Sequence, residues 1–144
     1  MAIVMVSGGT GMIGTHLSKH LIERGYEVII LTRDKNKSSP SPKISYSYWN
    51  VEKNIIDVAA VSKADHIVHL AGAGVMDKKW TEEYKKVIVE SRTKSAELII
   101  NCLKDNKNKV ETFVSASAIG WYGVDKKGAA NKGEFIESDL ASGD

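Results

Sequence analysis

The sequence has one cysteine and no long hydrophobic run, and each of these features excludes a class of protein. The single cysteine, Cys102, excludes an internal disulfide framework and suits a reducing compartment, so we expect a cytoplasmic protein. No apolar run reaches the ~20 residues that a membrane span requires, and no signal-peptide pattern opens the chain. A net charge of +2 with dispersed lysines argues against nucleic acid as a partner.

The composition that remains suits one globular domain. Its 144 residues are 42% hydrophobic and 26% charged, and a chain of this length buries about 70% of its unfolded surface. Apolar runs predict strands at 2–7, 27–32, 44–49, 66–72 and 112–117, and helices are expected at 11–25, 55–62 and 81–104. Residues 34–43 are a polar loop that contains both prolines. This alternation predicts an α/β fold: a doubly wound parallel sheet of the Rossmann type, with strand order 3-2-1-4-5 and three layers.

Two of the predicted helices carry further signals. In the first, Ile13, Leu17 and Leu21 recur every four residues and form its apolar stripe. In the long helix, Thr81 is a suitable N-cap, followed by two glutamates that complement the helix dipole. Ser91 and Ser95 interrupt its apolar stripe, so we expect this part of the helix to face a polar group. On the strand before it, His69 is expected to be a hydrogen-bonded core residue rather than a catalytic base.

A glycine-rich segment joins the first strand to the first helix. Gly8, Gly11 and Gly14 are spaced G-x-x-G-x-x-G, with Gly9 in addition. Such glycines allow a tight turn, close approach of a pyrophosphate and packing of helix on strand, while the helix N-terminus offers N–H groups to phosphates. A purely structural turn is the alternative, but the strand before the loop and the helix after it favour dinucleotide binding. The expected contacts are Gly8, Gly9, Thr10, Gly11, Met12, Ile13 and Gly14.

The end of the second strand bears on which dinucleotide binds. NAD sites usually place a carboxylate there, on the ribose 2′-hydroxyl, whereas this strand ends in Thr32 and Arg33. A guanidinium can pair with the 2′-phosphate of NADP and stack on adenine. Asp34 would keep NAD as the alternative if the strand ended later. We therefore favour NADP over NAD, with Thr32 and Arg33 as contacts.

Four segments together resemble a known superfamily. They are "VSGGTGMIGTHL" (6–17), "HLAGAG" (69–74), "DKKWTEEYKKVIVESRTKS" (77–95) and "SASAIGWYG" (115–123). The chain resembles the extended short-chain dehydrogenase/reductase superfamily, which includes NAD-dependent epimerases and dehydratases. More narrowly, it is similar to the atypical subgroup of cell-division-inhibitor-like sugar-nucleotide epimerases. Members run to about twice this length, so the resemblance implies that 1–144 is an N-terminal, NAD(P)-binding Rossmann domain that ends before the substrate-binding part.

The resemblance also implies site residues. A nicotinamide cofactor would lie across the carboxyl ends of the strands, with Ser117 as the catalytic residue that holds the reacting oxygen of the substrate. Further contacts implied with the cofactor are Leu70, Ala71, Gly72, Arg92, Ser115 and Ala116. Ala73 departs from the family, whose members commonly carry Glu after "LAG". The long helix after the fourth strand is a frequent dimer surface in this superfamily, which makes a homodimer possible.

A literal Tyr-x-x-x-Lys, Tyr122 to Lys126, follows Ser117 closely. In the superfamily such a pair lies one helical turn apart, where the ammonium lowers the pKa of the tyrosine. Gly123 disfavours a helix here and the segment has no helical period, so we interpret Tyr122 as the aromatic residue of a turn. No metal site is expected either, because the histidine pair at 16 and 20 has no third ligand suitably spaced.

Two functional hypotheses remain. In the first, the chain is the cofactor-binding half of an NADP-dependent oxidoreductase or nucleoside-diphosphate-sugar epimerase, inactive alone, whose substrate is a small molecule such as a sugar nucleotide. In the second, it is a non-catalytic NADP-binding or redox-sensing module, for which Ala73 is the motivating feature. The sequence names neither the substrate nor the direction of the reaction.

Overall fold

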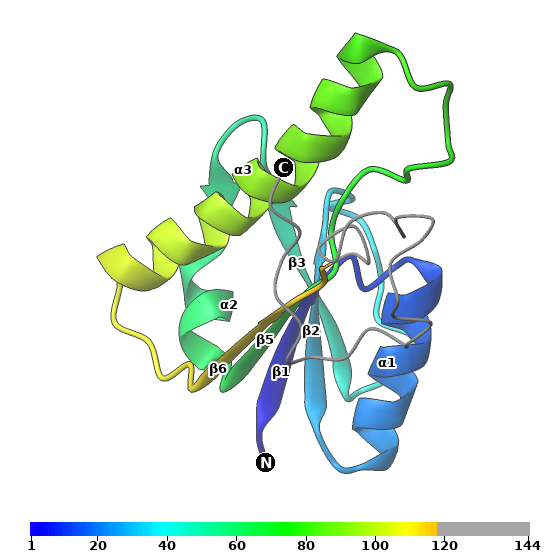
Figure 1. Cartoon of the computed structure of the whole chain (residues 1–144). Helices are drawn as coiled ribbons and strands as arrows, with labels where there is room; N and C mark the ends of the chain where they lie inside the picture. Colours follow the sequence, from blue (N-terminus) through cyan, green and yellow to red (C-terminus); the bar gives the residue numbers. More distant parts are fainter. Residues whose placement is uncertain (118–144) are drawn as a thin grey trace, which may run out of the picture.

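The computed structural model describes residues 1–117, which form a six-stranded sheet with helices on both faces (Figure 1). In chain order the elements are β1 (Ile3–Ser7), α1 (Met12–Glu23), β2 (Glu27–Thr32), β3 (Ile44–Asn50), β4 (Ile55–Ile56), α2 (Val58–Lys63), β5 (His66–His69), α3 (Glu82–Asp105) and β6 (Thr112–Ser115). The alternation of strands and helices predicted from the sequence is therefore present, and the α/β class is confirmed.

The sheet order is β4-β3-β2-β1-β5-β6. Its five long strands pair in parallel and follow the predicted order 3-2-1-4-5. The difference is β4, where we expected the start of a helix. Ile55 and Ile56 instead pair antiparallel with Asn50 and Trp49, and the helix begins only after Asp57. The carboxylate of Asp57 explains this boundary, because it accepts hydrogen bonds from two N–H groups of the first turn of α2.

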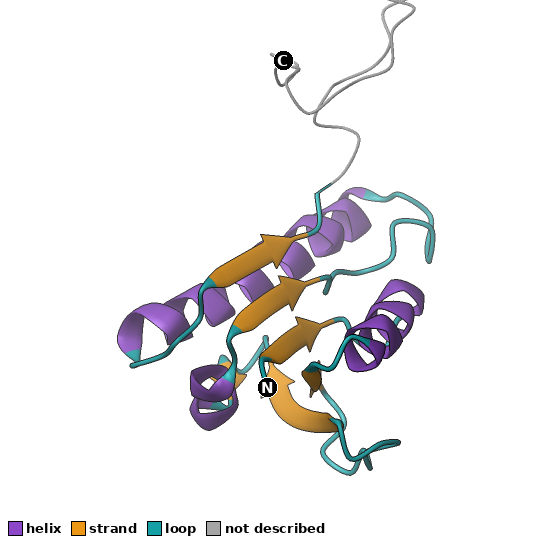
Figure 2. Cartoon of the chain, turned by 90° about the horizontal axis from the view of Figure 1, so that it is seen from below, coloured by secondary structure: helices purple, strands orange, loops and turns teal. Residues whose placement is uncertain are grey.

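Helices lie on both faces of the sheet (Figure 2), and a hydrophobic core lies on each face. On one face α2 and α3 cover Met5, Ile29 and Ile67, all of them buried. On the other face Val4, Val6, Val28 and Ile30 are buried against side chains of α1 and the segment after it. Successive strand residues point to opposite faces, so these continuous apolar strands fill both cores. This is the predicted three-layer arrangement.

Helix α1 packs on the sheet differently from its apolar pattern. We expected a stripe of Ile13, Leu17 and Leu21, yet Ile13 is 66% exposed and the two leucines are half-buried. The residues that α1 buries are Gly14 and Ser18. Small residues allow the first turns of the helix to lie close to the sheet and the glycine loop, which leaves Ile13 on the open side.

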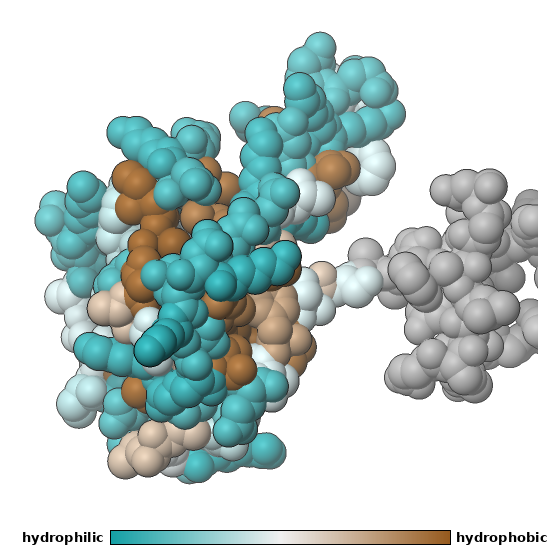
Figure 3. Space-filling view, turned by 90° about the vertical axis from the view of Figure 1, so that its left-hand side faces the viewer, coloured by the Kyte–Doolittle hydropathy of each residue, from teal (hydrophilic) through white to brown (hydrophobic). Residues whose placement is uncertain are grey.

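Helix α3 is longer than the strands that it covers, and its first turns project past the ends of the strands (Figure 1). Thr81 caps it as predicted, since its side chain accepts a hydrogen bond from the Tyr84 N–H. Its buried residues lie in the second half, whereas Val87 and Val89 are exposed. Figure 3 shows the face covered by α2 and α3, where hydrophobic residues remain visible between the polar ones. Within residues 1–117, no helix combines the length and apolar character needed to cross a membrane.

Candidate functional site

The residues predicted to bind a cofactor follow the carboxyl ends of four strands. The glycine loop follows β1, Arg33 follows β2, Leu70 follows β5 and Ala116 follows β6. Because these strands are parallel and adjacent, their carboxyl ends lie at one edge of the sheet (Figure 1). In open parallel sheets, ligands bind outside this edge where the strand order reverses, here between β1 and β5. The fold thus brings the predicted residues together.

Gly8 sits at the centre of this edge. It has a φ of +71°, a left-handed conformation that glycine adopts without strain. A Cβ added here would lie 2.8 Å from the carbonyl carbon of Leu70 and 2.9 Å from the backbone nitrogen of Ala71. Gly8 therefore lets the glycine loop pack directly on the backbone that follows β5, a contact that no other residue type would allow.

The remaining loop glycines bring α1 close. A Cβ on Gly14 would collide with the Gly8 carbonyl oxygen and lie 2.5 Å from the Cα of Gly9. One on Gly9 would lie 2.8 Å from the side chain of Ile30. Gly11 is the N-cap of α1 and offers no side chain to the free N–H groups of the first turn, which also lacks an acidic residue. These N–H groups and the positive end of the helix dipole are open to an anion.

At the end of β2, Arg33 is exposed and is the first residue past the strand. The buried Thr32 accepts a hydrogen bond from the Asp34 N–H, 3.1 Å long. The carboxylate of Asp34 in turn accepts from the Asn36 N–H at 2.9 Å. The strand ends where the sequence predicted, so Arg33 rather than Asp34 occupies the strand-end position.

The segment after β5 is held against α3. The guanidinium of Arg92 lies over Gly72, where an added Cβ would be 2.8 Å from Cζ. Its Nη1 donates to the Ile88 carbonyl at 2.8 Å, so the arginine side chain is held in place beside the loop. The Ala73 N–H donates to Ser91 Oγ at 2.8 Å. Gly72 and Arg92, both predicted as cofactor contacts, are thus neighbours at the same edge.

Two aromatic residues close this loop: the sequence suggested Trp80 as a packing anchor beside the start of the helix and Tyr84 as part of the helix stripe, but it did not predict their hydrogen-bond partners. Trp80 Nε1 donates to the carbonyl of Val75, and the Tyr84 hydroxyl donates to that of Gly74, both at 2.6 Å. Trp80 is nevertheless 59% exposed, which gives the site an exposed aromatic surface near the start of α3. The only signal in the sequence was the presence of aromatic residues flanking the helix start, which does not specify these partners.

Ser115 is the last residue of β6, Ala116 and Ser117 follow it, and all three are exposed. The Ala116 N–H donates to the His69 carbonyl at 3.0 Å, which extends the pairing of β5 and β6 by one step. Ser117 therefore lies at the same edge as the glycine loop. Tyr122 and Lys126 lie outside the described residues.

The expectation that the serines of α3 face a polar group is confirmed. Ser95 Oγ lies 3.2 Å from His69 Nε2, and Ser7 Oγ lies 2.7 Å from Nδ1 of the same ring. His69 is 4% exposed, so it is a hydrogen-bonded core residue as predicted. Ser7, the last residue of β1, was not singled out in the sequence.

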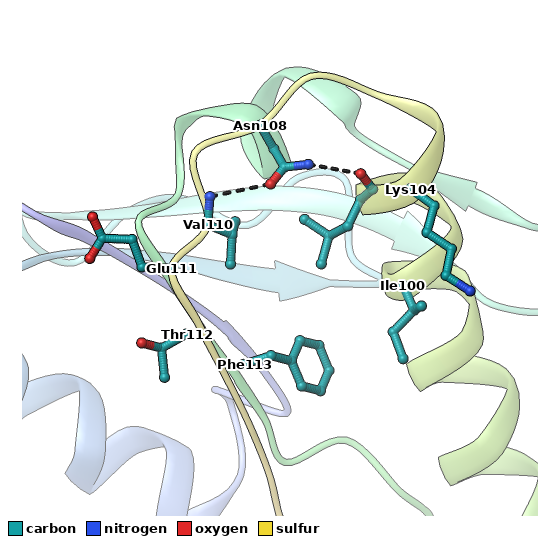
Figure 4. Close-up of a pocket in the computed structure, with 8 residues that line it drawn as sticks. Ile100, Lys104, Asn108, Val110, Glu111, Thr112 and Phe113 are labelled. Carbon is teal, nitrogen blue, oxygen red and sulfur yellow. Dashed lines mark hydrogen bonds between the residues drawn. The ribbon is translucent and has the colours of Figure 1, made fainter.

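A shallow hollow lies elsewhere, near the start of β6 and away from the carboxyl ends of the strands (Figure 4). The end of α3 and the start of β6 line it, and Asn108 bridges them by donating to the Leu103 carbonyl and accepting from the Val110 N–H. None of the predicted site residues lines this hollow. Among residues 1–117, no three His, Cys, Asp or Glu side chains form a group that could hold a metal ion.

The fold, together with the glycine loop at the carboxyl ends of the strands, defines a dinucleotide-binding type of α/β domain. The sequence model of the NAD dependent epimerase/dehydratase family matches residues 4–141, and the chain belongs to that family. An epimerase family protein from Staphylococcus saprophyticus is 38% identical over 124 residues, which cover 84% of this chain and 39% of the relative. A Staphylococcus haemolyticus counterpart is 37% identical over 118 residues, 82% of this chain and 38% of the relative. The chain thus spans about two fifths of the length of these relatives, and the resemblance recognised in its motifs is confirmed.

Solved structures agree with the fold. A crystal structure of a human epimerase family protein with NADPH superposes with a TM-score of 0.71 and 25% identity, covering 96% of this chain and 42% of that one. The protein MoeE5, in complex with UDP-glucose and NAD, gives a TM-score of 0.74 at 21% identity over 98% of this chain and 42% of that one. At that identity the second likeness supports the fold alone.

Proposed function

We propose that this chain is the NAD(P)-binding domain of an epimerase, dehydratase or related oxidoreductase, and that it prefers NADP. The observation that carries the proposal is the edge formed by the glycine loop, the uncapped N-terminus of α1 and Arg33. When bound, the nicotinamide would accept or donate a hydride. The residues of this chain would bind, orient and discriminate the cofactor.

The proposed pyrophosphate site consists of the glycine loop and the start of α1. Side chains at Gly8, Gly9 or Gly14 would collide with the backbone after β5, with Ile30 of β2 or with the loop itself, so glycines allow the loop and the start of α1 to pack this closely. Because Gly11 leaves the first turn of α1 uncapped, its N–H groups are the donors for the phosphates. The family of the chain agrees with this role.

The preference for NADP rests on Arg33. Its guanidinium follows β2 directly, where a carboxylate would repel a 2′-phosphate. The human relative with NADPH supports this cofactor. Lys35 and Lys37, in contrast, lie over the rings of Tyr48 and Tyr46, at 4.6 and 5.4 Å from the ring centroids. We therefore assign the discrimination to Arg33 and leave the lysines as part of the loop.

The experiment is calorimetric titration of the chain with NADP⁺ and NAD⁺, repeated on Arg33→Ala. A charged hydrogen bond contributes about 1.5–3 kcal/mol, so NADP⁺ should bind roughly 10- to 150-fold more weakly to the variant. NAD⁺, which lacks the phosphate, should bind within about a factor of two of its original affinity. Arg24→Ala is the matched control, because it removes the same charge at the far end of α1.

Three results would decide the matter. Loss of NADP⁺ affinity in Arg33→Ala but not in Arg24→Ala supports the assignment. Equal losses in both variants would mean that only net charge matters. Preferential binding of NAD⁺ by the original chain would overturn the preference for NADP while leaving the glycine loop in place.

For the chemistry, we propose that Ser117 holds the reacting oxygen of a small-molecule substrate, for which a sugar nucleotide is the candidate. Its exposed position past β6, at the edge that carries the glycine loop, supports this role. Ser117→Ala should then lower turnover while cofactor affinity is kept, as measured in the enzyme that contains this domain. Unchanged turnover would remove Ser117 from the mechanism.

The second candidate is a non-catalytic NADP-binding module. Ala73 favours it, because family members commonly carry a glutamate there and only the backbone N–H of Ala73 is engaged, with Ser91. This candidate predicts tight cofactor binding without turnover across a panel of sugar nucleotides and carbonyl compounds.

The cytoplasmic location and a homodimer formed through α3 remain proposals. Sedimentation of the chain would test the homodimer.

A further inference from the structure

A buried hydrogen-bond chain links β1, β5 and α3 on one face of the sheet, beneath the proposed cofactor site. His69 of β5 contacts Ser7 of β1 through Nδ1 at 2.7 Å and Ser95 of α3 through Nε2 at 3.2 Å. The exposed fractions are 0% for Ser7, 4% for His69 and 1% for Ser95. Buried polar groups of this kind are costly unless every one is paired, and here each has its partners.

The direction of each hydrogen bond follows from the acceptors at one end. Ser95 Oγ lies 2.6 Å from the Ser91 carbonyl and 3.1 Å from the Arg92 carbonyl, both of which only accept. The single proton of Ser95 is therefore donated to a carbonyl, and its oxygen accepts from His69. This places the ring proton of His69 on Nε2.

The other end of the chain is then fixed as well. With its proton on Nε2, a neutral His69 presents Nδ1 as an acceptor, so the hydroxyl of Ser7 donates to it. Ser7 Oγ has remaining acceptor capacity, and the Ala71 N–H donates to it at 3.3 Å. The protons thus run in order from Ala71 through Ser7 to His69, and from His69 through Ser95 to the Ser91 carbonyl.

We propose that His69 is a positioning residue of the cofactor site, which holds the Ser7 hydroxyl and, through it, the Ala71 N–H. These hydrogen bonds connect the end of β1 to the segment after β5, and the two meet at Gly8. Ser7 directly precedes Gly8, and Gly8 packs on the backbone of Leu70 and Ala71. That this site binds a cofactor rests on the proposed function, whereas the order of the hydrogen bonds does not depend on it.

The surroundings of His69 keep the ring neutral. Ser7 faces it from β1, Phe113 and Ser115 from β6, and Ser95 from α3, and none of these is charged. Helix α3 also places a charged group beside the segment after β5, the Arg92 guanidinium over Gly72. This positive charge would repel an imidazolium. Burial lowers the pKa of His69 below its ordinary 6.5, and the Arg92 backbone opposes this only in part. A second ring proton would also remove the acceptor for Ser7.

The first test is the protonation state of the ring, measured by ¹⁵N NMR on the histidine-labelled chain with His69→Gln for assignment. We expect His69 to carry its proton on Nε2 and its pKa to lie below the ordinary 6.5. A proton on Nδ1, or a pKa of His69 at or above 6.5, would overturn the proposal. This measurement needs no cofactor.

The second test separates the two ends of the ring. The amide of asparagine reaches about as far as Nδ1 and that of glutamine about as far as Nε2. His69→Asn can therefore keep an acceptor for Ser7, whereas His69→Gln can keep a donor for Ser95. We expect the glutamine variant to bind NADP⁺ about fivefold more weakly and the asparagine variant to stay within about twofold, although both lose stability.

Ser47→Ala controls for stability alone, because this buried serine of β3 donates to Asp57 Oδ2 on another part of the sheet. It should destabilise the chain and leave the affinity unchanged. If the affinities of all three variants follow their stabilities, His69 is structural and the positioning role is refuted.

Hydrogen exchange of the Ala71 amide gives a readout that does not depend on binding. Exchange should be faster in His69→Gln than in His69→Asn at equal global stability, and equal rates would refute the proposal. If the original chain binds neither NADP⁺ nor NAD⁺, the proposed function fails. The ring state and the Ala71 exchange rate then still decide whether His69 holds this backbone.

Discussion

The contact between Gly8 and the segment after β5 predicts a specific loss of stability in Gly8→Ala. An L side chain in the left-handed region costs about 1–2 kcal/mol. The added Cβ would also meet backbone atoms of Leu70 and Ala71 at 2.8–2.9 Å, which cannot rotate away as a side chain could. Overpacking of this kind costs about 1–3 kcal/mol more. We therefore expect the free energy of unfolding to fall by about 2–5 kcal/mol.

Gly25 provides the matched control. It has a φ of +91°, also left-handed, and an added Cβ would meet no atom within 4 Å. Gly25→Ala therefore carries the conformational cost of about 1–2 kcal/mol without any collision. The difference between the two variants isolates the contact of the glycine loop with the backbone after β5.

Urea denaturation followed by circular dichroism measures both free energies of unfolding, and calorimetry with NADP⁺ measures the site. We expect Gly8→Ala to be the less stable variant by at least about 1 kcal/mol and to lose cofactor binding, while Gly25→Ala keeps it. Two variants of equal stability, within about 0.5 kcal/mol, would refute the steric argument. Intact NADP⁺ binding by a folded Gly8→Ala chain would refute the role of this contact in the site.

Two further predictions concern groups away from the site. The Lys109 ammonium and, next, the Ile3 N–H hold the pKa of Asp65 below 3.8, so the stability that this carboxylate contributes should be complete above pH 3.8 and be lost as the pH falls further. Urea titrations at several pH values should show Asp65→Asn less stable than the original chain at neutral pH, with a gap that narrows below pH 3.8; a constant gap would contradict the ion pair as its source. Burial raises the pKa of the Cys102 thiol, so a thiolate-specific reagent should react slowly with the native chain and fast in denaturant. Fast reaction with the native chain would place Cys102 outside the core.

The parallel sheet could be predicted because its signals are local. Each long strand is a short apolar run, each helix has its own period or cap, and their alternation leaves few topologies. The strand β4 was missed because two residues carry no periodicity, and its pairing with Trp49 and Asn50 depends on a turn formed at 51–54. The exposed position of Ile13 was missed for the opposite reason: its local pattern was helical and apolar, but the close packing of Gly14 decided which side of α1 faces the sheet.

In the candidate site, too, some features follow from local sequence and others depend on tertiary packing. The glycine loop and Arg33 could be proposed from the sequence because, in each, the residue types and spacing that suggest the chemistry lie in one short segment. The contact of Arg92 with Gly72 and the closure of the loop by Trp80 and Tyr84 depend on how the start of α3 lies over the sheet. No periodicity encodes that placement, so residue identity alone could suggest Arg92 only through resemblance to a family.

The pair of Ser7 and His69 shows how a buried polar contact can specify register as well as position. The two residues are 62 apart in sequence and lie opposite each other where β1 pairs with β5. Because strand side chains alternate between faces, a slip of one residue would turn His69 away from Ser95 and into the apolar core under α1. An unpaired imidazole there would cost a desolvation penalty that the hydrophobic residues of these strands cannot impose, since they fill either face equally well. The same hydrogen bonds that hold Ala71 beside Gly8 therefore also penalise the slipped pairing, in which Gly8 would no longer lie opposite the end of β5.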